Sequence, residues 1–309
     1  MTVLAVRHET RCEYAAPVLL SRQLLHLTPR PDLHQEVRDH RIDLSPLPAE
    51  SSTASDYFGN AVLQAAITES HRVLTITAES TVRLNPRPLP RDLSAWESVR
   101  DRLAALDGPG ALDATRFAHD SPYVERNAAV RAYAAPTFTA GRSLIEALLD
   151  LNARIHAEFE FDPTATSVAT PLADVLRDRR GVCQDFAHLM IACLRSVGLS
   201  ARYVSGYILT APPPGMPRLV GSDASHAWVS AWCPGLPGDW LDLDPTNDCL
   251  VANEHVTLAW GRDFHDVTPT RGVIIGGGEQ ELQVAVTVSP LDDTGQHVPA
   301  VEPGASPIP

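Results

Sequence analysis

The stretch from Gly181 to Tyr207, GVCQDFAHLMIACLRSVGLSARYVSGY, constrains the fold of this 309-residue chain more than any other segment. Apolar residues recur at spacings of three and four between Cys183 and Val197, which predicts a helix that begins at Cys183 and has one buried face. Gly198 is a natural end for this helix, because glycine readily adopts the conformation that closes a helix. The segment ARYVSGYIL that follows predicts a strand. We therefore expect a helix that carries a cysteine in its first turn and leads directly into a sheet.

The rest of the C-terminal half follows the same order of elements. An earlier segment, SLIEALLDLNARIHAEFEF, has an apolar residue at every third or fourth position, which predicts another helix with one buried face. Later segments predict three more strands, over HAWVSAWC, DWLDLDP and QELQVAVTVSP. A helix followed by several antiparallel strands is typical of an α+β core in which the helix packs on the sheet.

The N-terminal part has a different pattern. Short strand-like runs separated by turn residues extend from Val3 to about Leu84, which predicts a β-sandwich-like domain. The proline-rich segment NPRPLPRDLSAW that follows is typical of a semi-rigid connector. We expect four parts: a β-domain over residues 1–90, a connector with helical segments over 91–140, the α+β core over 141–290 and a disordered tail over 291–309.

The net charge and the cysteine spacing limit which partners and which cellular compartment we expect. The formal net charge is −13, which disfavours broad binding to nucleic acid or to an anionic membrane. The N-terminus has no basic start followed by an apolar run, and no segment approaches the roughly 18 apolar residues of a membrane-spanning helix. Five cysteines without paired spacing favour a reducing compartment. We expect a cytoplasmic protein, and the oligomeric state stays open.

Cys183 is the first candidate for chemistry. At a helix N-terminus it would meet the positive end of the helix dipole and free backbone N–H groups, which favour the nucleophilic thiolate. The same N–H groups could hold the oxyanion of a tetrahedral intermediate. A structural role is the alternative, because cysteine is often a small buried residue at a helix end. Cys193, which lies inside the helix, is expected to fill the core.

A base and an acid for this cysteine are available on the following strands. Imidazole can both activate a thiol and protonate a departing amine near neutral pH. His226 begins a predicted strand, and Trp228 on the same face would restrict the imidazole and exclude water. The imidazole needs a carboxylate at its far nitrogen, and Asp242 and Asp244 share one face of the next strand, with Asp244 held extended by Pro245. Each of these residues, taken alone, is more often structural.

In this order the elements resemble the transglutaminase-like superfamily, which shares its core with papain-type cysteine peptidases. The segments GVCQDFAHLMIACLRSVGLSARYVSGY, SHAWVSAW and WLDLDPTND carry the resemblance, with PLADVLRDRRG as the lead-in. The resemblance implies a papain-like fold and a catalytic triad of Cys183, His226 and Asp244. Asp244 is the preferred acid because the family's aspartate stands in a W-x-x-x-D-x-T context, which this chain reproduces from Trp240 to Thr246.

Motifs outside the core narrow the resemblance to a bacterial subgroup of this superfamily. In its N-terminal β-domain an L-x-P-R element precedes a D-Y-F-G-N turn, and LTPR (27–30) and DYFGN (56–60) stand here in that order. GRDFHDVTPTRG (261–272) resembles the subgroup's closing motif, with Phe264 where tyrosine is expected. The resemblance covers about residues 1–290.

Four residues near the triad have open roles. Gln184, Trp228 and Asp242 are candidates for supporting it, with Gln184 either an oxyanion donor or a helix cap. His188 lies five residues after Cys183, so it projects from another face of the helix and is expected to be structural. The second oxyanion donor is not assigned.

Two further segments border the predicted site. Arg262 and Asp263 either line the cleft or form a surface ion pair. The proline-rich loop from Thr210 to Gly221 is expected to border the cleft from its position in the sequence.

No metal or cofactor is expected. The sequence contains no C-x-x-C motif, no H-E-x-x-H motif and no close cluster of cysteine and histidine, and the glycines at 276–278 lack the spacing and the lysine of a phosphate-binding loop. All basic residues are arginine, so no side-chain amine is available for a Schiff base.

These observations predict acyl transfer from an amide of a peptide or protein substrate. Cys183 would attack the carbonyl, His226 would protonate the departing amine, and the resulting thioester would be resolved by water or by an amine. We favour water, which makes the protein a cysteine-dependent hydrolase of peptide, isopeptide or side-chain amide bonds. The alternatives are a protein-glutamine gamma-glutamyltransferase and a non-catalytic binding scaffold.

Overall fold

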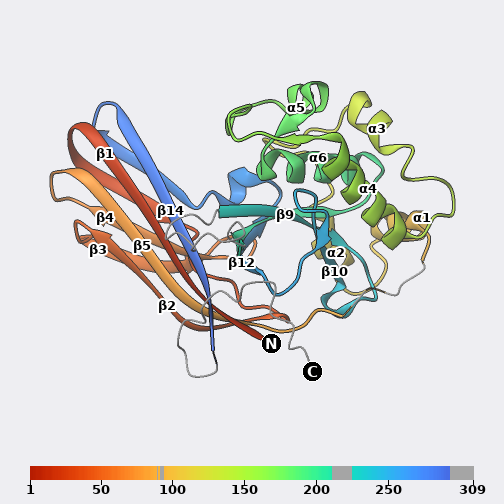
Figure 1. The fold of residues 1–309 in the computed structure, drawn as a ribbon, viewed down its shortest axis with the longest axis horizontal. Coiled ribbons are helices and arrows are strands. Elements are labelled where there is room, and N and C mark those ends of the chain that lie inside the picture. Colours follow the sequence, from red (N-terminus) through yellow and green to blue (C-terminus); the bar gives the residue numbers. More distant parts are fainter. Residues whose placement is uncertain (89, 91–93, 211–224, 293–309) are drawn as a thin grey trace, which may run out of the picture.

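The computed structural model describes residues 1–88, 90, 94–210 and 225–292. A strand-rich part lies beside a part in which helices cover a second sheet (Figure 1). The predicted α+β class, with an N-terminal β-domain and a helix packed on an antiparallel sheet, is confirmed. Apart from their first residues, the loop expected to border the cleft and the predicted tail lie outside the described residues.

The N-terminal sheet is organised around one long strand, β1 (Thr2–Leu25). The other strands are β2 (Gln35–Ser45), β3 (Glu50–Ser55), β4 (Ala61–Ile67), β5 (His71–Leu84), β13 (Thr270–Gly276) and β14 (Gln280–Leu291). The first half of β1 lies between β5 and β14, and its second half lies between β4 and β13. β2 extends the first group of strands and β3 extends the second.

The two groups of strands enclose a common apolar core. Leu74 and Ile76 of β5 pack there with Ile67 of β4, Leu44 of β2 and Leu25 of β1. Sharing β1 between both groups lets one strand contribute to two layers, as expected for a sandwich-like domain.

Residues 270–291 complete this sheet, although their position in the sequence places them with the core. β13 and β14 together run antiparallel to β1 along most of its length. β14 is the strand predicted over QELQVAVTVSP, but its partner, like that of β13, is almost the whole chain away, and backbone pairing leaves no mark on composition. β3 carries no strand pattern, because all six of its residues are exposed and they show no apolar alternation.

The core contains a five-stranded antiparallel sheet. Its strands, in spatial order, are β11 (Cys249–Leu250), β10 (Trp240–Asp244), β9 (Ser225–Trp232), β8 (Ala201–Ile208) and β12 (His255–Gly261). The predicted helix is present as α6 (Cys183–Ser196), and it packs against β8 and β9, with Phe186 and Met190 in the same apolar cluster as Val229. Gly198 follows with a φ of 85°, the conformation that favours glycine after a helix.

The remaining elements precede α6 or connect strands. They are α1 (Trp96–Ala104), α2 (Ala111–Thr115), α3 (Ala128–Ala134), α4 (Leu144–Glu158), α5 (Leu172–Asp178), the short parallel strands β6 (Glu160–Phe161) and β7 (Arg180–Gly181), and the 3-10 turns η1 (Pro237–Asp239) and η2 (Phe264–Val267). α4 is the second helix that the sequence predicts. No helix in the described part of the chain is long and apolar enough to cross a membrane. None of the five cysteines, all of which lie among the described residues, forms a disulfide.

Two carboxamide side chains join the β-domain to the outer edge of β12. Gln35 donates from Nε2 to Thr257 O and accepts from Thr257 N, both at 2.8 Å. Asn60 does the same with Trp260, at 2.9 Å to its carbonyl oxygen and 3.0 Å from its amide nitrogen. Each carboxamide therefore takes the place of a neighbouring strand and satisfies backbone groups that an edge strand leaves open.

The two N-terminal motifs meet at this edge. Arg30 of LTPR donates to Asn60 Oδ1 at 2.8 Å, and its guanidinium lies 3.6 Å from the centre of the Trp260 ring. Asp56 of DYFGN accepts from the side chain of Asn60 at 2.7 Å. These motifs therefore hold the β-domain against the core strand β12.

Candidate active site

Asp185, in the first turn of α6, fixes the start of the helix and thereby the position of Cys183, because its side chain accepts a hydrogen bond from the backbone. Asp185 Oδ2 accepts from Val182 N at 2.8 Å and from Thr166 Oγ1 at 2.7 Å. A Cβ on residue 181 would lie 2.7 Å from the same oxygen, so only Gly181 allows this close approach. The segment GVCQD thus fixes the start of α6. Cys183 is the first residue of this helix, and its thiol is half-buried.

Helix geometry leaves the backbone N–H groups of Cys183 and Gln184 without intrahelical partners. Both groups stand at the positive end of the α6 dipole. A carbonyl oxygen that gains negative charge beside Cys183 would therefore meet N–H donors already in place.

His226 connects α6 with β10. It is the second residue of β9 and is almost fully buried, and its Nε2 lies 2.7 Å from Asp244 Oδ2 at the end of β10. Its side chain is also hydrogen-bonded to Cys183. Since Nε2 is engaged by Asp244, the nitrogen that serves the thiol is Nδ1. Cys183, His226 and Asp244 thus form a continuous chain of side-chain hydrogen bonds.

Asp244 is fully buried and is surrounded by hydrogen-bond donors. Its Oδ1 accepts from the backbone N–H groups of Thr246 and Asn247 at 2.9 and 3.2 Å. Its Oδ2 lies 2.7 Å from His226 Nε2 and 3.1 Å from His255 Nε2, and accepts from Asn247 Nδ2 at 2.6 Å. Burial alone would raise the pKa of Asp244, but the hydrogen bonds to the two histidines and to Asn247 hold it well below its usual range.

The hydrogen bond between Asp244 and His226, which lowers the pKa of Asp244, raises the pKa of His226. Burial alone would lower the pKa of His226, but the hydrogen bonds to Asp244 and Cys183 raise it to about 10. The imidazole therefore carries both protons at neutral pH, and it holds a proton that can be given to a departing amine.

Trp228 packs beside this imidazole as the strand pattern predicts. Its ring lies 6.1 Å from that of His226, and it is fully buried. A Cβ on residue 206 would lie 2.4 Å from the Trp228 ring and 2.1 Å from Val256 O, so Gly206 on the neighbouring strand makes room for the indole.

The other two supporting candidates make different contacts. Asp242 accepts from Arg87 Nη1 at 2.6 Å, and burial is outweighed by Arg87 and Arg202, which lower the pKa of Asp242. Gln184 directs its Nε2 toward Val168 O at 3.5 Å. Asp242 thus faces the connector, and the Gln184 side chain is neither a helix cap nor aimed at an oxyanion in this conformation.

His188 is held in a structural contact, as the sequence predicts. Its Nε2 accepts from Phe264 N at 3.2 Å, and its ring stacks on Tyr123. Burial, with a smaller contribution from Arg195, lowers the pKa of His188 to about 3.

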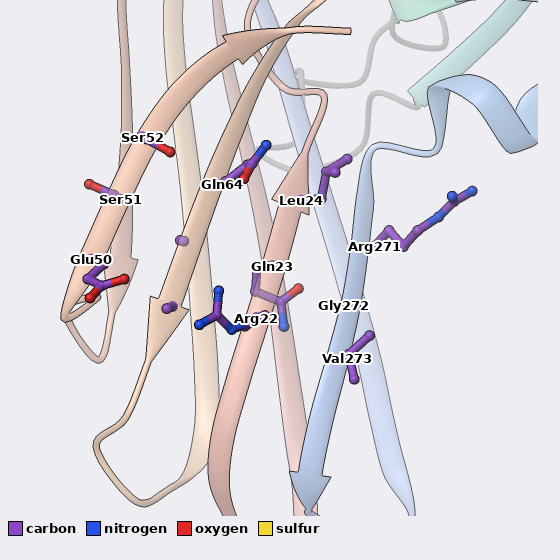
Figure 2. A pocket seen from close by; sticks show the side chains of 12 residues that line it. Arg22, Gln23, Leu24, Glu50, Ser51, Ser52, Gln64, Arg271, Gly272 and Val273 are labelled. Atoms are coloured by element: carbon purple, nitrogen blue, oxygen red, sulfur yellow. The ribbon is translucent and has the colours of Figure 1, made fainter.

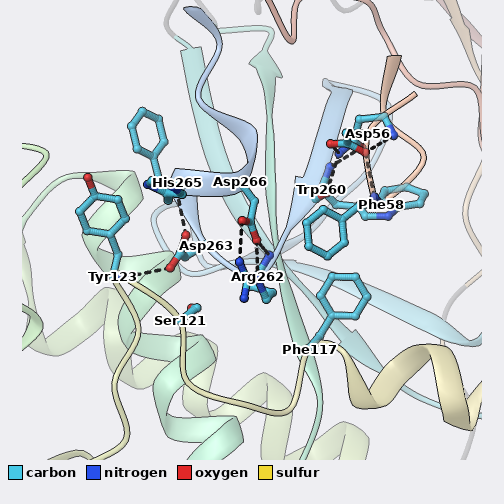
Figure 3. Close-up of polar contacts among 12 residues, drawn as sticks. Asp56, Phe58, Phe117, Ser121, Tyr123, Trp260, Arg262, Asp263, His265 and Asp266 are labelled. Atoms are coloured by element: carbon cyan, nitrogen blue, oxygen red, sulfur yellow. Dashed lines mark hydrogen bonds and ion pairs between the residues drawn. The ribbon is translucent and has the colours of Figure 1, made fainter. Parts of the chain in front are cut away.

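The closing motif at 261–272 contains the 3-10 turn η2, and Figure 3 shows the polar contacts of Arg262, Asp263 and Asp266 there. Arg262 pairs with Asp266 at 2.8 Å, and Asp263 accepts from the backbone N–H groups of Tyr123 and His265 at 2.8 and 2.9 Å. The expected ion pair therefore forms with Asp266 and not with Asp263, because Asp263 points inward to satisfy backbone amides.

His255 was missed by sequence reasoning. It is the first residue of β12 and His226 is the second residue of β9, and both place Nε2 on the same carboxylate oxygen. The segment NEHV carries no spacing that links it to the triad. The one available signal is a histidine at the start of a strand, and that signal is weak.

His226, Asp244 and His255 are also the group that could ligate a metal, since their donor atoms lie within 4.8 Å of one another. The contacts do not fit that role. Asp244 Oδ2 already accepts from Asn247 and from both imidazole nitrogens, so the lone pairs a metal would need are occupied by hydrogen bonds.

Two hollows lie elsewhere on the described surface. One has a volume of about 600 Å³ and lies across β1, β3, β4 and β13, where Arg22, Glu50 and Gln64 line it (Figure 2). The other, of about 1000 Å³, lies between the connector and β10, beside Arg87 and Trp240. None of the three triad residues lines either hollow, so neither is the candidate active site.

Comparisons with known proteins agree with this arrangement. A family model described as the bacterial transglutaminase-like N-terminal region matches residues 4–83, and one described as the transglutaminase-like superfamily matches residues 131–245. An uncharacterised protein of Mycobacterium tuberculosis is 44% identical over 300 residues, which cover 94% of both chains. The chain belongs to the transglutaminase-like superfamily. This transglutaminase-like chain is also 31% identical over 292 residues to an uncharacterised protein of Mycobacterium leprae, covering 93% of this chain and 99% of that one.

Two other matches concern the core and the fold. A Pseudomonas aeruginosa protein named protein-glutamine gamma-glutamyltransferase is 36% identical over 107 residues, which are 34% of this chain and 16% of that protein. The crystal structure of a candidate cysteine protease from Cytophaga hutchinsonii superimposes with a TM-score of 0.73 at 20% identity, covering 96% of this chain and 93% of that one. The papain-like fold is therefore confirmed, and family and fold together support a papain-like cysteine enzyme.

Proposed function

We propose that this transglutaminase-like protein is a cysteine-dependent hydrolase of amide bonds in peptides or proteins, with Cys183 as nucleophile, His226 as acid and base, and Asp244 as the acid that orients the imidazole. The observation that carries the proposal is the continuous chain of side-chain hydrogen bonds through these three residues. A thiol, an imidazole and a carboxylate in this order are the parts that acyl transfer from an amide needs.

The reaction proceeds in two halves. The Cys183 thiolate attacks the carbonyl carbon, and the oxyanion of the tetrahedral intermediate is held by the N–H groups at the start of α6. The C–N bond breaks as His226 gives its proton to the departing amine, which leaves a thioester on Cys183. Water then attacks the thioester and loses a proton to His226, and breakage of the C–S bond releases the acid and returns Cys183 as the thiolate beside the protonated imidazole.

Transfer of the acyl group to an amine is the second candidate. It is favoured by the local similarity to the Pseudomonas protein named as a gamma-glutamyltransferase. Because the chain has no lysine, it cannot supply a side-chain amine to its own thioester, and an acceptor would have to come from another molecule. A binding scaffold without activity is the third candidate, and the intact chain of hydrogen bonds argues against it. The cytoplasmic location stays a prediction.

Mass spectrometry of the products separates the two reactions. The protein is incubated with glutamine-containing peptides, with and without a primary amine, and Cys183→Ala is the control. We expect chain cleavage or conversion of the side-chain amide to an acid in both samples. Incorporation of the amine would replace the hydrolase proposal by the transferase.

Labelling of thiols tests the nucleophile itself. A thiol-directed reagent at neutral pH should modify Cys183 faster than the buried Cys193 and Cys233, and the modified peptides identify the site. If Cys183 is modified no faster than these two cysteines, the catalytic account fails and the scaffold gains support.

A further inference from the structure

We propose that His255 is a fourth member of this site, a positioning residue that donates a hydrogen bond to Asp244 and thereby sets how strongly that carboxylate holds His226. The expected effect of His255 on turnover rests on the proposed function. The hydrogen bond from His255, a second imidazole, to the carboxylate of Asp244 does not.

The geometry joins the two histidines through one oxygen atom. His226 Nε2 and His255 Nε2 lie 2.7 and 3.1 Å from Asp244 Oδ2. His255 is only 3% exposed, and Asp244 is fully buried. Little water can therefore compete for these contacts, and a hydrogen bond to an ionised group is stronger in such surroundings than in solvent.

Trp228 fixes both imidazoles. Its ring lies 6.1 Å from that of His226 and 5.3 Å from that of His255, at interplanar angles of 35° and 79°. One indole thus packs against both histidines, so neither can turn away from Asp244 without displacing a buried tryptophan.

The contacts of His255 indicate which of its two ring nitrogens carries the hydrogen. An ionised carboxylate only accepts, so His255 must carry its hydrogen on Nε2. Its Nδ1 is buried and has no hydrogen-bond partner among the described residues. A hydrogen at Nδ1 would be a buried donor without an acceptor among the described residues, so the geometry places the shared hydrogen on Nε2.

The β-domain holds the strand that carries this histidine. Gln35 pairs with both backbone groups of Thr257, two residues after His255 on β12. The carboxamide keeps the edge strand in register, and β12 in turn presents His255 to Asp244. This gives the N-terminal domain a part in aligning the site.

Among the described residues, the ionisable groups that face the His226–Asp244 pair come from three elements. They are Cys183 on α6, His255 on β12 and Cys249 on β11. Burial and the charge of Asp244 raise the pKa of Cys249 to about 11, so this thiol is neutral over most of the range of interest. His255 is therefore the neighbour whose removal changes Asp244 most directly.

Loss of the His255 donor has a defined direction. Asp244 Oδ2 would share its charge among fewer hydrogen bonds and would attract the proton of His226 more strongly. The pKa of His226 should then rise, and transfer of its proton to a departing amine should slow.

Two substitutions separate the hydrogen bond from packing. His255→Phe keeps a ring against Trp228 and removes the donor, whereas His255→Gln keeps an N–H near the position of Nε2. His255→Asn is a polar control that is too short to reach Asp244, and it replaces His255→Phe if that protein does not fold.

Nitrogen NMR of histidine-labelled protein tests the structural content without turnover. We expect His255 in the tautomer with hydrogen on Nε2, and we expect the titration of His226 to move up by about half a pH unit in His255→Phe. His255→Gln should titrate like the unaltered protein. The proposal is overturned if His255 carries its hydrogen on Nδ1, or if His226 titrates identically in all of these proteins.

Kinetics test the consequence. We expect kcat to fall about tenfold in His255→Phe with little change in KM, and to recover in His255→Gln. Equal losses in both variants would indicate packing alone and would sink the positioning role. An unreactive Cys183 would instead defeat the proposed function, while the NMR result would still decide the role of His255.

Discussion

Two fully buried aspartates of the core, Asp244 and Asp263, show how partners decide what burial does. Asp244 Oδ2 faces two imidazoles and a carboxamide. Asp263 accepts from the backbone N–H groups of Tyr123 and His265 (Figure 3). A backbone amide is too weak an acid to transfer its proton to a reacting group, whereas a protonated imidazole can do so. One buried carboxylate therefore lies beside groups that can transfer protons, and the other holds the backbone of a turn.

The histidines beside these aspartates differ in the same way. The pKa of His226 is raised to about 10, because hydrogen bonds to Asp244 and Cys183 outweigh burial. The pKa of His188 is lowered to about 3 mainly by burial, and its Nε2 accepts a hydrogen bond from Phe264 N. A charged partner therefore reverses the effect of burial on the same side chain.

Substitution of Cys183 should have the largest effect on activity. If activity survives it, Asp244 does not act with this thiol, and the contrast between Asp244 and Asp263 fails. Cys183→Ala should lower kcat/KM by about 10⁴-fold or more, because no other group forms the thioester. Circular dichroism should show an unchanged fold. Cys249→Ala is the matched control and should retain activity; residual turnover in Cys183→Ala within tenfold of the starting value would contradict the assignment.

Substitution of the two strand aspartates sharpens the comparison at the triad. Asp244→Asn should lower kcat by about 10³-fold or more, because an amide in place of the carboxylate cannot stabilise the imidazolium of His226. Asp242→Asn should cost much less, since Asp242 pairs with Arg87. Steady-state kinetics of both variants decide the matter, and the reverse order would make Asp242 the triad acid.

Asp263→Asn tests the structural half of the comparison. One of its two N–H donors would face an amide group that cannot accept, which should lower the free energy of unfolding by about 1–3 kcal/mol. Denaturant unfolding measures this loss, and kcat per folded molecule should stay close to the starting value. A fall in kcat as large as that of Asp244→Asn would remove the distinction between the two regions.

His188 and His226 should contribute to stability in opposite pH ranges. This effect should be smaller than the effects of the substitutions above. In the unfolded chain both bind a proton near pH 6.5. His188 binds it only near pH 3 when folded, so its contribution is present above about pH 6.5 and is lost as the pH falls toward 3. For His226 the folded pKa is raised to about 10, so its contribution is present below about pH 6.5 and is lost as the pH rises through 10.

Urea midpoints across this range provide the measurement. His188→Gln should flatten the acid side and leave the alkaline side unchanged. Activity should decline near pH 10, as His226 loses the proton that the leaving amine needs. An acid side that stays equally steep in His188→Gln would assign the effect to other groups, of which the buried His8, with its pKa lowered to about 4, is the first candidate.

Much of the core was predictable, because its elements are specified by short-range patterns. The spacing of apolar residues predicted α6 and α4, Gly198 predicted the end of α6, and the segments after it predicted β8, β9 and β10. The choice of Cys183, His226 and Asp244 as the predicted triad depended further on the resemblance to a family, since none of the three has a distinctive context by itself.

Other parts could not be predicted for physical reasons that differ from case to case. β14 was predicted as a strand, but its pairing with β1 and that of β13 span nearly the whole chain, and β3 has no buried face. The roles of Gln35 and Asn60 depend on the outer edge of β12, which exists only once the core sheet has formed.

The sequence by itself determined that a cysteine starts a helix and that a histidine and an aspartate lie on the strands after it, because helix and strand patterns act over a few residues. The tertiary structure alone decided that His255 shares Asp244 with His226, and that Asp263 serves backbone amides. Hydrogen-bond partners are set by distances of about 3 Å between atoms far apart in the chain, and no local pattern encodes those distances.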